Sequence, residues 1–494
     1  MAELLISVMP EQTRVALTEN FRLSELYVEN ARERGIVGNI YKGKVVRVLK
    51  GMQAVFVDIG EKRTAFLYVD EVRNIDIPEL ENGVDDSLQS AGVKNNIADM
   101  LKERAEILVQ VIKEPRGGKG GRLTCYLALP GRYLVLLPNI NRIGVSKRIE
   151  DQTERQKLND ILEAIKPDNM GLIARTVARG KSEKILKAEL NFLLKTWSVV
   201  EKRAKQNAAP FKLHEDMPLF LRVIRDLLYP EVSRVIVDDE LAYQKIRETF
   251  GASVPECLKI LELYNFAKPL FDYYGIDKEI DNALETNVWL NSGGFVVIQP
   301  TEAMVVVDVN SGKYVGKESF EKTALKVNTE AAKLIAKELR VRNLSGIVVV
   351  DFIGVEGPDN MQKVCDALAS ELKKDRARVS TPRNLSELGL VEFTRQRRYP
   401  SLIEMMCKKC PSCGGKGYIK SPTTVVCEIL AKLDLMAESI SQKGVVIVAH
   451  TSVAKLLTER MSESILAREK RMRNKITIEP SHTISPEEFK VTVR

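Results

Sequence analysis

The stretch from residue 303 to residue 354 decides the fold of the chain's central part. It contains two nearly repeated runs, Ala303-Met304-Val305-Val306-Val307-Asp308-Val309-Asn310 and Gly346-Ile347-Val348-Val349-Val350-Asp351-Phe352-Ile353. Each run is short, rich in β-branched residues and apolar up to an aspartate, which is typical of a buried strand. We therefore expect two buried strands that end near Asp308 and Asp351.

The segment between these runs has a helical pattern. From about residue 317 to residue 342, apolar residues recur at three- to five-residue steps and form one face, made of Phe320, Ala324, Val327, Ala331, Leu334 and Leu339. Strand, helix and strand make a βαβ-like unit, which brings the two strand ends close together. The sequence thus predicts Asp308 and Asp351 side by side, at the edge where an α/β sheet usually carries its site.

Two neighbouring carboxylates repel each other, and a divalent cation resolves that repulsion. Mg2+ prefers one or two carboxylates, supplemented by waters and by substrate phosphate oxygens. Asn310 lies two residues after Asp308, so both side chains point to the same side of an extended chain and the amide can orient the carboxylate. The alternative is that each aspartate merely ends a strand at a solvated turn. A matched pair flanking one helix favours the magnesium site.

Composition sets the outer limits. The chain has 494 residues, which is too long for one hydrophobic core and indicates three or more units. A net charge of +8 suggests a polyanionic partner but also fits solvated surface.

No apolar run in the sequence approaches the roughly 20 residues that a membrane span needs, and we see no signal peptide. Seven cysteines, three of them clustered, fit metal binding in a reducing compartment, so we expect a cytoplasmic protein.

Residues 36–125 are expected to form an oligonucleotide-binding (OB) barrel. Alternating runs predict its strands, at residues 38–48, 51–60, 63–68 and 107–112. Such barrels stack bases on exposed aromatics and bind phosphates through Lys and Arg. Phe56 and Phe66 lie in two of these strands, although a Phe in a strand is more often a core residue. The Gly-rich segment around Lys119 suits close approach of a phosphate backbone, or is a mobile hairpin turn.

A cysteine cluster lies near residue 410. Cys410 and Cys413 form a Cys-x-x-Cys turn, which presents two thiolates to one zinc ion, and structural zinc takes four ligands. Two subunits, each supplying this pair, would complete the tetrahedron. Cys407 is an additional cysteine, so a site within one chain that uses three cysteines and a histidine stays open.

The run Val307-Asp308-Val309-Asn310-Ser311-Gly312, followed by the second aspartate run, resembles the ribonuclease E/G family, and the resemblance covers nearly the whole chain. In that family the two aspartates bind the catalytic Mg2+ and the asparagine orients the first of them. The resemblance therefore implies these roles for Asp308, Asp351 and Asn310. It also implies contacts with single-stranded RNA for Phe56, Phe66 and Lys119, and a zinc ion shared between subunits for Cys410 and Cys413.

The resemblance further implies a sensor for the RNA 5′ end within residues 126–211. The matching positions are Gly131, Val135, Arg175 and Thr176. An arginine fork, a hydroxyl and a close backbone make a pocket for a terminal phosphate chemically sensible. Without the family, Arg175 and Thr176 would be an unremarkable surface pair.

The expected fold is a multidomain mixture of α+β and α/β regions. The resemblance implies that the N-terminal strands near residues 4–28 pair with a later segment; the alternative is a self-contained hairpin, which its small size disfavours. The basic run 394–398 is expected either to follow the RNA backbone or to be a solvated face.

In chain order the units that the resemblance implies are the first segment of an interrupted RNase H-like fold (1–35), the OB-type RNA-binding barrel (36–125), the 5′-sensor domain (126–211), the second segment of the RNase H-like fold (212–285), a DNase I-like catalytic domain (286–400), a zinc link (401–420) and a small α/β oligomerisation domain (421–494).

We expect a Mg2+-dependent endoribonuclease. The three histidines, His214, His450 and His482, lie outside the carboxylate segment, which disfavours catalysis by a histidine pair through the 2′-hydroxyl. Metal-assisted attack of water on phosphorus would leave a 5′-phosphate and a 3′-hydroxyl. The alternatives are a non-catalytic, zinc-linked RNA-binding protein and a metal phosphodiesterase acting on DNA.

The resemblance also implies a biological setting. The substrate would be single-stranded RNA, with stimulation by a 5′-monophosphate, in the maturation of rRNA and tRNA precursors and in mRNA decay. The assembly would be a homodimer joined through the shared zinc, with a homotetramer left open. We expect the short branch of the family rather than the branch that carries a long scaffold tail.

Overall fold

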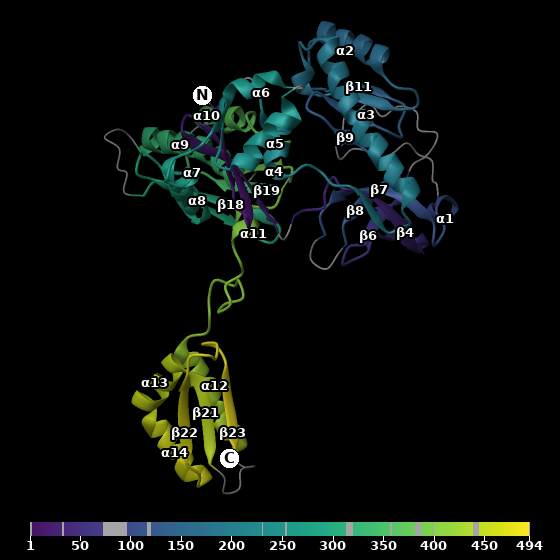
Figure 1. Ribbon diagram of the computed structural model, residues 1–494. Helices are drawn as coiled ribbons and strands as arrows, with labels where there is room; N and C mark the ends of the chain where they lie inside the picture. Colours follow the sequence, from purple (N-terminus) through teal and green to yellow (C-terminus); the bar gives the residue numbers. More distant parts are fainter. Residues whose placement is uncertain are drawn as a thin grey trace. The chain divides into compact units, whose positions relative to one another are not determined.

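The computed structural model describes residues 2–31, 34–72, 96–115, 120–229, 231–251, 254–312, 320–355, 358–380, 386, 388–397, 399–437 and 444–493. Lys119 and Arg398 lie outside these residues. The chain divides into two compact units, Met1–Leu402 and Ile403–Arg494, which we treat separately (Figure 1). Within the described ranges, no helix is both long enough and apolar enough to span a membrane.

A five-stranded sheet in the first unit carries the two aspartates. Its strand order is β16-β17-β18-β19-β20, with bounds Asn287–Trp289, Phe295–Pro300, Met304–Asn310, Gly346–Asp351 and Val391–Arg395. Strands β18 and β19 are parallel, and helix α9 (Phe320–Val341) connects them (Figure 1). The predicted strand–helix–strand unit is therefore confirmed.

Helices cover one face of this sheet. The inward side chains of β18 and β19 share a core with α9 and with α10 (Pro358–Leu372), through residues such as Val307, Val350, Ile335 and Leu368. The alternate side chains are exposed, with Val306 at 38% and Ile347 at 48%. The β-branched runs had predicted buried strands; the structure instead buries one face and leaves the other open among the described residues.

Segments far apart in the sequence build a second sheet, of order β15-β14-β1-β2-β3. The bounds are Ala2–Val8 (β1), Gln12–Glu19 (β2), Arg22–Asn30 (β3), Val232–Val237 (β14) and Leu261–Leu263 (β15). Strand β1 pairs in parallel with β14, Leu4 lying opposite Val235. The N-terminal strands are thus not a self-contained hairpin.

Both faces of this second sheet are covered. Leu4 packs in a core with helices α4 (Leu219–Leu227) and α5 (Glu240–Phe250), whereas the adjacent Leu5 packs with α7 (Leu270–Tyr273) and α8 (Ile276–Leu284). Successive side chains of a strand point to opposite faces. Because both faces of β1 are buried, its sequence contains an unbroken apolar run.

The predicted barrel is present as a closed five-stranded sheet. Strands follow the order β4-β5-β6-β8-β7, and β7 pairs back to β4. Their bounds are Ile40–Leu49 (β4), Ala54–Asp58 (β5), Ala65–Tyr68 (β6), Glu106–Lys113 (β7) and Arg122–Thr124 (β8). The short β8 was not predicted, and β13 (Phe211–His214) adds to β4 from outside.

The segment after the barrel forms a four-stranded sheet of order β11-β12-β10-β9. The strands are Leu129–Pro130 (β9), Leu134–Leu137 (β10), Ile143–Val145 (β11) and Gly171–Ala174 (β12). Helices α2 (Gln152–Ile165) and α3 (Glu183–Gln206) share its core, which includes Leu136, Leu162 and Leu190.

The second unit holds a three-stranded sheet of order β22-β21-β23, with helices beside it (Figure 1). Its strands are Val445–His450 (β21), Ile476–Ser481 (β22) and Phe489–Val493 (β23); its helices are α12 (Pro422–Met436), α13 (Thr451–Glu459) and α14 (Ser462–Met472). From the sequence we expect a helix, a strand at residues 444–449, a second helix near residues 453–461, and strands near residues 475–478 and 489–493. The structure confirms these elements and adds α14, which was not predicted because it is largely charged and buries only Ile465 and Met472.

Candidate active site and RNA-contacting sites

Asp308 and Asp351 lie directly opposite each other on the parallel strands β18 and β19. Both side chains are exposed, on the open face of the sheet. Asn310 donates a hydrogen bond from Nδ2 to Oδ2 of Asp308 over 2.9 Å. The structure therefore brings the three residues together as predicted, while their roles stay a prediction.

A buried asparagine holds the segment that follows Asp351. Asn328 of α9 is fully buried, donates from Nδ2 to the carbonyl oxygen of Ile353 over 2.7 Å, and accepts from the N–H of Ile353 over 3.0 Å. This two-point clasp ties the end of β19 to the helix. Sequence reasoning missed Asn328, although a polar residue on the apolar face of a predicted helix was a usable signal.

Glycines allow the turn between β16 and β17 to pack against the segment after Asp308. A Cβ on Gly294 would lie 2.6 Å from the carbonyl oxygen of Asn310, and one on Gly312 would lie 2.8 Å from that of Gly293. Gly312 also has a φ of +58°, which favours glycine. The backbone beside Asn310 is thus confined by close packing.

The donor set of this site fits a hard divalent cation. Two exposed carboxylates on adjacent strands supply oxygen ligands, and the Asn310 amide orients one of them. Within the described residues, no three His, Cys, Asp or Glu side chains converge on one point. The chain would therefore supply two carboxylates and leave the remaining positions to waters and phosphate oxygens, as Mg2+ prefers.

The basic run at residues 394–398 is partly structural. Arg395 is buried, and its Nε lies 2.7 Å from Oδ2 of Asp375. Its Nη1 donates to Oδ1 of Asn343 and to the carbonyl oxygen of Leu344. Arg395 therefore serves the fold, so neither interpretation of the run, as an RNA path or as a solvated face, holds at this position.

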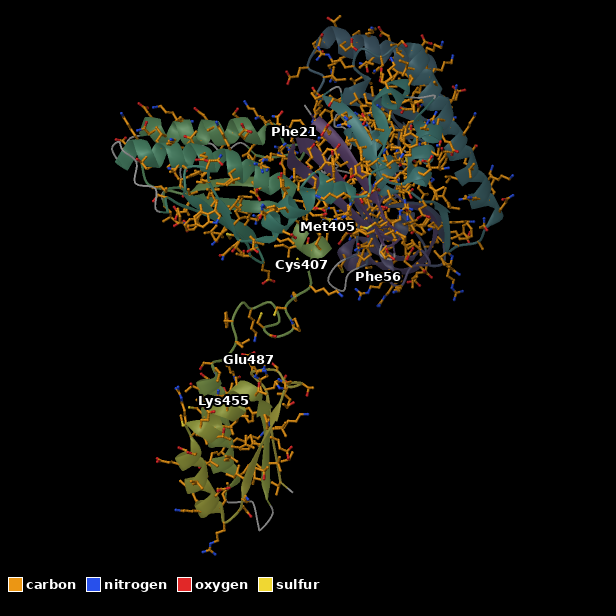
Figure 2. The ribbon with its side chains drawn as sticks, turned by 60° about the vertical axis from the view of Figure 1, so that its left-hand side comes forward. Phe21, Phe56, Met405, Cys407, Lys455 and Glu487 are labelled. Carbon is orange, nitrogen blue, oxygen red and sulfur yellow. The ribbon has the colours of Figure 1, made fainter. Side chains whose placement is uncertain are left out.

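Aromatic side chains gather on the outside of the barrel. Phe56 of β5, labelled in Figure 2, lies opposite Phe66 of β6. Both side chains are half-buried, and their ring centroids are 4.4 Å apart. Their neighbours Val55 and Val57 point into the barrel and are buried. The two rings are thus not core residues, and they offer π-faces at the surface.

The strip continues beyond the two predicted residues. The ring of Tyr68 stacks near that of Phe66, and the Arg122 guanidinium lies 5.2 Å from the Tyr68 ring centroid. Arg47 of β4 is exposed and lies opposite Phe56. Sequence reasoning missed these three side chains because their alignment depends on strand register.

Gly131 and Arg175 are in contact. Nη1 of Arg175 donates to the carbonyl oxygen of Gly131 over 2.6 Å and to Oδ1 of Asp226 over 2.8 Å. The Thr176 hydroxyl lies 3.0 Å from that of Ser146, and Val135 is buried in β10. The four predicted positions therefore lie around the end of β12: Val135 pairs with Ile173 of that strand, Arg175 and Thr176 follow it, and Gly131 contacts Arg175.

Asp226 is a further member of this group that the sequence did not reveal. It lies on α4 and bonds to both Arg175 and Arg225. Burial favours its neutral form, but the charges of Arg225 and Arg175 outweigh burial and hold the pKa of Asp226 below its ordinary value. The ionised form of Asp226 is therefore favoured beside the candidate sensor arginine.

Glu189 of α3 shapes the loop that carries Gly131. Its carboxylate accepts hydrogen bonds from the backbone N–H groups of Arg132, Tyr133 and Leu134 at 2.6–2.8 Å. Burial raises its pKa even against these three bonds. A Cβ on Gly131 would lie 2.7 Å from Cδ of Glu189, so only glycine fits this close approach.

The cysteine turn lies in the second unit. Cys410 is exposed and Cys413 half-buried, and Cys407 follows α11 (Leu402–Met406) (Figure 2). The backbone N–H groups of Gly417 and Gly415 hold the pKa of Cys413 below its usual value, which favours the thiolate that binds metal. Because no group of three metal-binding side chains occurs in the described ranges, a one-chain zinc site using three cysteines and a histidine is not formed there.

Two family models match the chain. The model described as Ribonuclease E/G family matches residues 128–398, which is more than half of the chain. The model described as RNase E/G, Thioredoxin-like domain matches residues 409–494 in the second unit.

Full-length similarity to curated proteins agrees with these matches. Ribonuclease G of Salmonella typhimurium is 36% identical over 492 residues, covering 100% of this chain and 99% of that protein. Ribonuclease G of Escherichia coli is 37% identical with the same coverage. Ribonuclease E of Haemophilus influenzae is 35% identical over 99% of this chain but only 51% of its own length.

Proposed function

The chain belongs to the ribonuclease E/G family and is an endoribonuclease, and on that premise we propose that it hydrolyses single-stranded RNA at a Mg2+ site formed by Asp308 and Asp351. The observation that carries the proposal is the pairing of these two residues on adjacent parallel strands. Both carboxylates face solvent, where a polynucleotide can reach them.

Each residue of the site has a distinct task in this proposal. Asp308 and Asp351 would hold the cation, and Asn310 would hold Asp308 in the orientation that binding requires. The chemistry supplied there would be activation of a water molecule and neutralisation of charge on the phosphate oxygens. Asn328 keeps the backbone after Asp351 in place, so the spacing of the two carboxylates does not relax. The products are a 5′-phosphate and a 3′-hydroxyl.

The RNA strand would also contact the barrel. Phe56 and Phe66 are proposed to stack bases, supported by their position on the outer surface. Arg47 lies opposite Phe56 in the sheet, and Arg122, which is also paired with Glu71, lies opposite Phe66; both are suited to phosphate contacts. Lys119 belongs to the same proposal on the family resemblance alone.

The 5′ end of the RNA would be read by Arg175, Thr176 and the backbone near Gly131 and Val135. A terminal monophosphate carries about −1.5 to −2 charges at neutral pH, like a phosphorylated side chain, and matches an arginine fork. The contact between Arg175 and Gly131 supports a pocket at this place. Stimulation by a 5′-monophosphate follows from it.

The wider assignments rest on the same premise. We assign an OB-type fold to the barrel, an RNase H-like fold to the sheet that contains β1 and β14, and a DNase I-like fold to the sheet that contains β18 and β19. We also assign the enzyme to the cytoplasm, with roles in rRNA and tRNA maturation and in mRNA decay. Cys410 and Cys413 would share zinc with the same pair of a second subunit, since one chain offers two ligands on this turn. A homodimer results, and two dimers can pair further.

Substitution of the aspartates tests the central assignment. Asp308→Asn or Asp351→Asn should abolish RNA cleavage at saturating Mg2+, because an amide replaces a metal-binding carboxylate. RNA binding should largely persist, since the barrel supplies most of the affinity. The measurements are cleavage of a labelled single-stranded RNA and its retention on a filter.

A matched control uses another carboxylate of the same open sheet face. Glu392 of β20 is exposed there and does not belong to the pair, so Glu392→Gln should cleave normally. Near-normal turnover by either aspartate variant would refute the metal site. Equal cleavage of a single-stranded DNA of the same sequence would instead favour a general phosphodiesterase.

A further inference from the structure

The open face of the aspartate sheet carries an aromatic pair beside the candidate catalytic residues. Strand register places Trp289, Phe295 and Asn310 in one row across β16, β17 and β18. The adjacent row runs through Val297 to Asp308 and Asp351. Residues opposite each other across a sheet project from the same face, so the indole shares the face with both carboxylates.

Trp289 is unusually exposed for its size. Its side chain is 69% exposed, whereas the chain's second tryptophan, Trp197, is 6% exposed. The indole contacts Phe295, with ring centroids 5.3 Å apart and planes tilted by 53°. One edge of the indole is thus supported by the protein while much of its surface remains available.

The backbone around Trp289 is firmly held. The next residue, Leu290, is buried and closes the turn through a 2.8 Å hydrogen bond from its N–H to the carbonyl oxygen of Gly294. The N–H groups of Asn291 and Ser292 donate to the carboxylate of Glu330 on α9. The turn is therefore held against α9. Because this backbone is already ordered, binding of a ligand to the indole would cost little further loop entropy.

The distance between the pair and the carboxylates suits one polynucleotide. Trp289 lies two strands and two residues away from Asp308, which corresponds to about 12 Å for ordinary strand spacing and rise. An extended RNA strand bridges that span within a few nucleotides. A base unstacked from the strand offers a flat π-face, which an exposed indole binds without sequence preference.

We propose that Trp289, supported by Phe295, is a stacking platform for one base of the RNA strand whose phosphodiester lies at Asp308 and Asp351. The platform positions the substrate and does not act in the bond-breaking step. The inference rests on the proposed function for the identity of the strand. We expect single-stranded RNA on this surface rather than a second copy of the chain. Trp289 and Phe295 lie in the same row of the sheet as Asn310, which contacts the candidate catalytic Asp308.

Fluorescence gives a direct test, because the chain has two tryptophans. In full-length protein carrying Trp197→Phe, all indole emission comes from Trp289. Asp308→Asn is added so that the RNA is not cut, and a single-stranded oligoribonucleotide is titrated in. Saturable quenching with the same midpoint as filter binding supports the platform. Bound RNA without quenching overturns it. Cleavage of the RNA by this variant would instead contradict the metal site, so the two failures are distinguishable.

Kinetics on otherwise unaltered protein provide the second test. Trp289→Ala should lower kcat/KM about fivefold to a hundredfold, mainly through KM, and Trp289→Phe should restore most of it. An RNA with one abasic position should show the same loss in wild type and no added loss in Trp289→Ala. A scan of abasic positions identifies the stacked nucleotide.

Phe266→Ala is the matched control, because Phe266 is 68% exposed and lies in a different aromatic cluster. It should leave kcat/KM unchanged. Wild-type kinetics in Trp289→Ala, or an equal loss in Phe266→Ala, would overturn the proposal. So would a fall in particle mass by light scattering in Trp289→Ala, which would make the face a contact between subunits.

Discussion

The Arg175 side chain contacts the protein through one of its terminal nitrogens, Nη1. Both bonds that the structure describes for its side chain use Nη1, to Gly131 and to Asp226. The guanidinium is planar with five N–H donors, so anchoring one nitrogen orients the other edge. Asp226 thereby serves as the resting counter-ion of Arg175 and fixes the direction of its free edge.

Arg175→Gln should slow cleavage of 5′-monophosphorylated RNA by about tenfold to a hundredfold, since a lost charge-assisted contact typically costs about 1.5–3 kcal/mol. The same change should barely affect a 5′-hydroxyl RNA, which does not use the pocket. A 5′-triphosphate, which is bulkier, should not accelerate the wild type. The measurement is the initial rate on one RNA bearing each of the three 5′ ends.

The pattern across the three substrates decides the role of Arg175. Equal slowing on every 5′ end would mean that Arg175 supports the fold or the general RNA path, and the sensor would be abandoned. Because the substitution also leaves Asp226 with only Arg225, a thermal melt should accompany the rates to show that the variant is folded.

Among the elements, the β2–β3 hairpin has a turn whose backbone conformation does not suit one of its residues, Phe21. Its two-residue turn, Asn20-Phe21, has positive φ at both positions, 50° and 62°. Asparagine tolerates this conformation, but a phenylalanine there is strained. Phe21 is also 71% exposed, so packing gives little in return (Figure 2).

Phe21→Gly should stabilise the first unit by up to about 1 kcal/mol, because glycine adopts positive φ without a Cβ clash. The measurement is the midpoint of urea unfolding. Phe21→Ala is the matched control, since it removes the ring but keeps the Cβ and should gain little. Lower stability in Phe21→Gly would show that the exposed ring makes a contact that outweighs the backbone strain.

For the whole molecule, the proposed assembly depends on the turn that carries Cys410 and Cys413. A structural zinc site is tetrahedral, and this pair would provide two of its four ligands. The backbone N–H groups of Gly417 and Gly415 lower the pKa of Cys413, which favours the thiolate form. Under the proposal, the same pair of a second subunit would supply the other two ligands across a two-fold axis.

Cys410→Ser or Cys413→Ser should lose zinc and halve the particle mass. Metal analysis and light scattering on the full chain measure both. Cys427→Ser, which changes an exposed cysteine of α12, should keep both properties. A variant that loses its zinc but retains its mass would leave the bridging role without support.

Local sequence patterns predicted most of the elements of this protein and the pairing of Asp308 with Asp351. The β-branched runs, the apolar periodicity between them and the parallel pairing that a connecting helix imposes were enough to put Asp308 opposite Asp351. The Asn310 contact followed in the same way, because residues two apart on a strand share a face. These features depend on periodicity within short segments, which can be recognised directly in the sequence.

The contacts between polar and aromatic side chains that are far apart in the sequence follow from tertiary packing and not from any local pattern. The tertiary structure placed Asn328 under Ile353, Asp226 beside Arg175, and Arg395 in the core with Asp375. It also showed that one face of the aspartate sheet is open, with Trp289 on it. Such contacts depend on the register of strands and the packing of helices from distant segments, and the pattern within any one segment does not specify them.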